Sequence, residues 1–132
     1  MNLRISEKLH AIAKSLNELK DTGAVKGRKG NEHGYAKILQ IKTGCSIWIH
    51  HWHDDRLAID LLISQPALSR YPSECESSIN TFKELFTDMV ETKPWSHHDG
   101  RSKEHETYYI DVSKKTEGEI LKLIDLIKSK YS

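Results

Sequence analysis

The chain has few of the residues that mark secreted, membrane-bound or disordered proteins. Its 132 residues include only two cysteines and three prolines, and its apolar runs are far too short to span a bilayer. Cys45 and Cys75 lie far apart and outside any Cys-x-x-Cys motif, which favours reduced thiols over a disulfide. The first ten residues, MNLRISEKLH, have no apolar signal-peptide core. We therefore expect a cytoplasmic protein without a membrane segment.

An excess of charge of one sign is also missing. The 20 lysines and arginines nearly balance the 19 acidic residues, which gives a formal net charge of +1. Proteins that bind nucleic acid by bulk attraction are usually more basic, so any such role would depend on a local patch. Because the sequence has neither an internal repeat nor a linker, we expect residues 1–132 to form a single domain.

Apolar residues recur at helical spacing in three segments. The first segment, residues 5–19, carries them three and four positions apart. In the second, Ser73 and Glu76 have the spacing of a capping box before an apolar helical pattern. Thr116 and Glu119 form a second capping box ahead of the third segment. The sequence therefore predicts three helices.

Between the first two helices the apolar pattern changes to a period of two. Residues 35–42, 46–53 and 57–64 are rich in β-branched and aromatic side chains, which are typical of strands. Thr43-Gly44 and Asp54-Asp55 separate them and suit tight turns. We expect these segments to form three antiparallel strands.

Two further strands are expected at residues 94–100 and 107–112, before the last helix. The predicted order is α-β-β-β-α-β-β-α. Strands that follow one another in this way, without single alternating helices, are typical of an α+β fold. We therefore predict a mainly antiparallel sheet of about five strands with three helices.

The register of the second hairpin decides which side chains share a face. A loop of residues 54–56 would pair His53 with Leu57 and Ile49 with Leu61, so that apolar residues meet. One face would then carry Ile47, Ile49, Leu57, Ile59, Leu61 and Ile63. The other face would carry Trp48, His50, Trp52, Ala58, Asp60 and Leu62.

This second face holds the main candidates for binding. Trp48 and Trp52 are flat rings that bury a large area at low entropic cost when they meet a partner. His50 is predicted to lie directly across from Asp60. The two could form a charge-assisted hydrogen bond, or a catalytic acid–base pair in which the carboxylate orients the imidazole.

A glycine-rich loop, VKGRKGNEHG, is a second candidate for binding. Lys26, Arg28 and Lys29 alternate with glycines that would let an anion approach the backbone. The spacing does not match a P-loop, and a helix precedes this loop instead of following it. Together with the aromatic face, the loop makes contact with a nucleic acid possible.

The histidines offer a possible metal site. His51 and His53 are two apart on one strand, so both side chains would point the same way. Zinc or another divalent transition metal would need further ligands, for which His97, His98 and Asp99 are the candidates.

Two hypotheses follow for function. The leading one is a non-enzymatic binding module of the inhibitor, immunity or accessory type, whose partner is a protein or, second to that, a nucleic acid. The alternative is a metal-dependent hydrolase or nuclease that uses the histidine cluster, in which the metal would activate a water molecule. The sequence also leaves open a homodimer formed through an edge strand or through the aromatic face.

Overall fold

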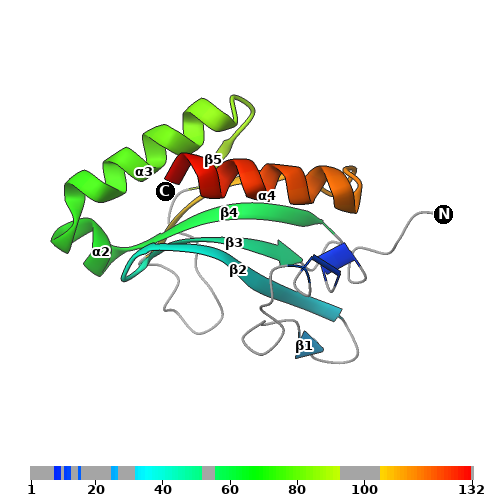
Figure 1. The fold of residues 1–132 in the computed structure, drawn as a ribbon. Coiled ribbons are helices and arrows are strands. Elements are labelled where there is room, and N and C mark those ends of the chain that lie inside the picture. The colour runs from blue at the N-terminus through cyan, green and yellow to red at the C-terminus, as the bar shows by residue number, and fades with distance from the viewer. Residues whose placement is uncertain are drawn as a thin grey trace.

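The fold is built around an antiparallel sheet that carries its helices on one face (Figure 1). The computed structural model describes residues 8, 9, 11, 12, 15, 25–26, 32–51, 56–92 and 105–131. Within them the sheet has six strands in the order β1-β2-β3-β4-β6-β5, and each neighbouring pair is antiparallel. The prediction of an α+β fold with a mainly antiparallel sheet is confirmed.

The elements differ in detail from the predicted order. The strands are β1 (Val25–Lys26), β2 (Glu32–Lys42), β3 (Cys45–His51), β4 (Leu57–Ser64), β5 (Val90–Thr92) and β6 (His105–Asp111). The helices are α2 (Gln65–Arg70), α3 (Pro72–Leu85) and α4 (Glu117–Tyr131), and the described residues between 8 and 15 are also helical. No described helix is both long and apolar enough to cross a membrane.

Helix α2 was not predicted, and α3 does not begin as predicted. Ser64 caps α2, because its side chain accepts a hydrogen bond from the amide of Ala67 at 3.3 Å. Helix α3 then begins at Pro72, whose fixed φ and missing N–H suit the first helical position. The predicted capping box is therefore wrong, since Ser73 and Glu76 lie inside the helix.

The capping box of α4 is confirmed. The amide of Thr116 donates to Glu119 Oε1 at 2.9 Å, and the amide of Glu119 donates to Thr116 Oγ1 at 3.2 Å. The pKa of the Glu119 carboxyl is lowered, because the backbone amide and the side chain of Thr116 both favour its charged form. The local sequence was sufficient to predict this helix start, because the two residues that form the capping box lie only three positions apart.

The turn between β2 and β3 consists of Thr43 and Gly44, as predicted. Gly44 has a φ of +80°, a conformation that side chains other than glycine adopt at a cost. Its carbonyl accepts a hydrogen bond from the amide of Ser64 at 2.8 Å, which ties the turn to the end of β4. A Cβ at position 44 would clash with Ser64 Oγ and lie 3.2 Å from the Cβ of Ala67.

The register of β3 and β4 differs by two residues from the predicted one. His51 pairs with Leu57, Ile49 with Ile59 and Ile47 with Leu61, so residues 52–56 connect the paired ends. Both registers match apolar residues with each other, and the sequence could not separate them. Because the shift is even, each residue keeps its predicted face.

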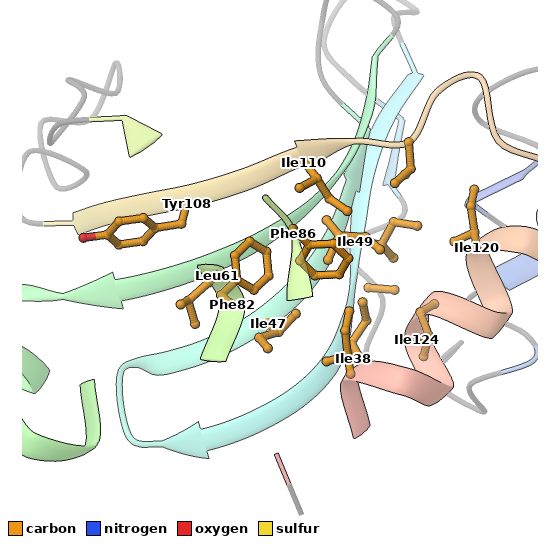
Figure 2. Packing of buried hydrophobic residues seen from close by; sticks show 14 of the residues in the cluster. Ile38, Ile47, Ile49, Leu61, Phe82, Phe86, Tyr108, Ile110, Ile120 and Ile124 are labelled. Atoms are coloured by element: carbon orange, nitrogen blue, oxygen red, sulfur yellow. The ribbon is translucent and has the colours of Figure 1, made fainter. Parts of the chain in front are cut away.

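The core lies between this apolar face and the helices (Figure 2). The six residues predicted for it on β3 and β4 are all fully buried. Phe82 of α3 and Phe86, which caps the end of that helix, meet edge to face at a ring separation of 4.9 Å. Ile120 and Ile124 of α4 pack into the same cluster. Leu9 also belongs to it, which places the N-terminal helical residues on this side of the sheet.

Candidate functional site

The second face of the sheet carries polar and aromatic side chains. Helices α3 and α4 lie over the opposite, apolar face (Figure 1). We call this second face the Trp48 face and define it by Lys37 on β2, Ser46, Trp48 and His50 on β3, Ala58, Asp60 and Leu62 on β4, and Thr107 and Tyr109 on β6. The strand alternation thus confirms that Trp48, His50 and Asp60 share a face.

Asp60 lies at the centre of this face. Strand β4 runs between β3 and β6, and the pairing places Asp60 directly opposite Trp48 on one side and Tyr109 on the other. Asp60 is only 5 % exposed, whereas both aromatic residues are half-buried. A buried carboxylate therefore lies in one row with two aromatic residues.

His50 contacts Asp60 diagonally instead of from the paired position. The residue directly across from His50 is Ala58, which corrects the predicted pairing. His50 Nδ1 lies 3.2 Å from Asp60 Oδ2, because diagonal neighbours in an antiparallel pair are within reach of long side chains. The contact was predicted correctly, although the register that produces it was not.

The carboxylate of Asp60 is only partly satisfied. Burial raises the pKa of Asp60, and the hydrogen bond and charge of His50 oppose that rise. Within the described part of the chain, Asp60 Oδ1 is buried and has no hydrogen-bond partner. Buried oxygens are nearly always hydrogen-bonded, so this atom is an exception among the described side chains.

Trp48 is fixed by two contacts on the same face. Its indole Nε1 donates a hydrogen bond to Ser46 Oγ at 2.7 Å, which sets the ring orientation. The ammonium of Lys37 lies 5.4 Å from the ring centroid, within the range of a cation–π interaction. The ring therefore already holds a cation of the chain itself.

Sequence reasoning missed several members of this face. Ser46 lies two residues before Trp48 on the same predicted strand, so alternation was a usable signal for it. Lys37 lies opposite Trp48 on the neighbouring strand and depends on the register of that pair. Tyr109 could be found only with the strand order, because β6 lies between β4 and β5 and so pairs with a strand that does not directly precede it in the chain.

The other predicted binding residues have different outcomes. Lys26 ends β1, where it pairs with Glu32 of β2. Trp52, Arg28 and Lys29 lie outside the described residues. The joint surface of basic loop and aromatic strand therefore stays a prediction.

The predicted metal site also lies mostly outside the described residues. His51 ends β3 and pairs with Leu57, while the other candidates are not described: His53, His97, His98 and Asp99. Among the described residues, no group of three or more histidine, cysteine or acidic side chains could hold a metal ion. The metal site therefore stays a prediction from the sequence.

Comparison with known proteins assigns no role to this site. No protein-family model, curated protein or solved structure matches the chain. Its interpretation therefore depends on the geometry of the Trp48 face.

Proposed function

We propose that the chain is a non-enzymatic binding module that recognises a protein partner through the Trp48 face. The observation that carries this proposal is the row of Trp48, Asp60 and Tyr109 on the face opposite the helices. Tryptophan and tyrosine are the residues that most often dominate the energy of protein interfaces.

The charges of the face favour a protein over a nucleic acid. Asp60 at its centre would repel phosphate groups, and the described cation beside it, Lys37, is already held over Trp48. The near-neutral net charge gives no further attraction for a polyanion. Contact with a nucleic acid through the basic loop is therefore the secondary form of the proposal.

The proposed setting is the cytoplasm, where the chain would serve as an inhibitor, immunity or accessory protein. Cys45 and Cys75 are both buried free thiols, which suits a reducing compartment.

The test is partner capture with matched variants. Tagged wild-type protein, Trp48→Ala and Leu126→Ala are used to capture partners from cells that express the chain, with nuclease treatment to remove nucleic acid. Leu126 lies on α4 and is 41 % exposed, so its truncation controls for loss of an apolar surface side chain elsewhere. A partner that wild type and Leu126→Ala retain but Trp48→Ala loses would support the proposal, provided that all three melt cooperatively.

Equal capture by the three proteins would contradict the proposal. Capture that disappears on nuclease treatment would support the secondary, nucleic-acid form in its place.

A further inference from the structure

The two cysteines of the chain meet in the core, on the side of the sheet opposite the Trp48 face. Cys45 is the first residue of β3, and Cys75 lies in the first turn of α3. Both thiols are free, and both side chains are fully buried in the same apolar cluster. The fold thus brings together two reactive groups that are distant in the sequence.

Neighbouring residues show how closely this part of the core is packed. The thiol of Cys75 donates a hydrogen bond to the carbonyl oxygen of Ala67 on α2 at 3.5 Å. A Cβ at Gly44, the residue before Cys45, would lie 3.2 Å from the Cβ of the same Ala67. Ser78 lies one turn after Cys75 on α3, and its hydroxyl forms a hydrogen bond with the thiol of Cys45. Cys45 therefore lies against the face of α3 that carries Cys75.

The two thiols are also in direct contact, since they share a hydrogen bond. Among the described residues, no group of three or more histidine, cysteine or acidic side chains could hold a metal ion, so the pair lacks the additional ligands that zinc needs. A disulfide, in contrast, requires only two sulfur atoms that the fold places side by side.

We propose that Cys45 and Cys75 form a disulfide when the chain folds in the presence of a small disulfide oxidant such as oxidised glutathione. One cysteine thiolate attacks a sulfur of the oxidant, which releases one glutathione and leaves a mixed disulfide on the protein. The other cysteine thiolate attacks the protein sulfur of that mixed disulfide and releases the second glutathione. The two protein thiols lose two protons and two electrons in total, and the oxidant takes them up as two glutathione thiols.

Burial links this reaction to folding. Burial raises the pKa of both thiols and brings that of Cys45 to about 11, and only a thiolate attacks a disulfide. The folded reduced protein therefore exchanges slowly, and a disulfide formed between the same buried positions is equally shielded from reductants. The state of the pair records the redox conditions under which the chain folded. This property does not depend on the proposed binding partner.

The bond would join β3 to α3 across a long stretch of chain. A cross-link between distant residues stabilises the folded state, because it restricts the freedom of the unfolded chain. The protein would thus resist unfolding more strongly after folding in an oxidising compartment than after folding in a reducing one.

The experiment measures the redox equilibrium of the full chain, folded and unfolded. Wild-type protein is incubated at pH 8 in glutathione buffers of varied redox ratio, in native buffer and in urea, until reduced and oxidised starting material give the same composition. Remaining thiols are then alkylated, and mass spectrometry identifies the peptide in which Cys45 is linked to Cys75. In native buffer the equilibrium should favour the disulfide about 30- to 1,000-fold more than in urea, because folding holds the thiols together.

A second readout and two variants complete the test. The urea midpoint of the oxidised wild-type protein should exceed that of the same protein kept with a reductant, a comparison that needs no variant to fold. Cys75→Ala should show no difference between these two conditions, whereas Ser78→Ala, which keeps both thiols, should still give the linked peptide.

Three results would overturn the inference. These are the absence of the linked peptide in native buffer, the same glutathione equilibrium in native buffer and in urea, and an oxidised wild-type protein that is less stable than the reduced one.

Discussion

The substitution Gly44→Ala tests how the turn between β2 and β3 is coupled to the start of α2. Gly44 has a φ of +80°, and a Cβ there would clash with Ser64 Oγ. An alanine in a left-handed conformation costs about 1–2 kcal/mol. Displacing Ser64 Oγ also removes the hydrogen bond that it accepts from Ala67, and the loss of such a cap costs about 1 kcal/mol.

The two costs add to about 2–3 kcal/mol of lost unfolding free energy, before the contact with Ala67 Cβ at 3.2 Å is counted. Urea denaturation followed by circular dichroism measures this quantity. The matched control is Gly118→Ala in α4, where an added Cβ meets nothing within 4 Å. This control should stabilise the protein by about 0.4–1 kcal/mol, since alanine reduces the freedom of the unfolded chain.

A double-mutant cycle separates the two causes. Ser64→Ala alone should cost about 1 kcal/mol, but in the Gly44→Ala background it should cost almost nothing, because the cap is already displaced. The reasoning is refuted if Gly44→Ala changes stability by less than about 0.5 kcal/mol, the usual range for inconsequential surface changes. It is also refuted if the effects of Gly44→Ala and Ser64→Ala are additive.

Four further results are expected. Thr116→Ala should lower the unfolding free energy by about 1 kcal/mol, because the amide of Glu119 loses its hydrogen bond to Thr116 Oγ1. An unchanged urea midpoint would contradict this. Phe82→Ala should cost about 3–5 kcal/mol, since the ring is fully buried, and a smaller loss would mean that the core collapses around it. At pH 8 the thiols of Cys45 and Cys75 should resist alkylation until denaturant is added, because burial raises the pKa of both and brings that of Cys45 to about 11; mass spectrometry would show modification of the native protein if this is wrong. Untagged protein purified without chelator should contain no stoichiometric transition metal and should melt at the same temperature with EDTA, whereas bound metal would favour the hydrolase alternative.

Sequence patterns predicted those features whose determinants lie close together in the chain. The capping box of Thr116 and Glu119 is contained within four residues, and its hydrogen bonds formed as expected. The strands around Gly44 followed from a period of two and a turn signal. In contrast, the capping box predicted at Ser73 did not form, because the helix begins at Pro72, which suits the first helical position without a side-chain cap.

The sequence predicted which side chains of the site share a face of the sheet, but not which of them lie next to one another. Alternation along β3 and β4 placed Trp48, His50 and Asp60 on one side, and an error of two residues in register left that result intact. The position of Tyr109 depends on the non-sequential order β4-β6-β5, which no local pattern encodes. That Asp60 Oδ1 has no hydrogen-bond partner among the described residues likewise depends on its surroundings in three dimensions.

Asp60 lies on β4, a strand that is hydrogen-bonded to a neighbour along both of its edges. Its backbone cannot move without breaking one of these two ladders, in contrast to a residue on a loop, which can adjust at little cost. A partner bound at the proposed Trp48 face would therefore meet a rigid sheet, and the ordering cost of association would fall mainly on that partner. Such a face would favour partners whose binding surface is already ordered, and would discriminate against those that must first reorganise.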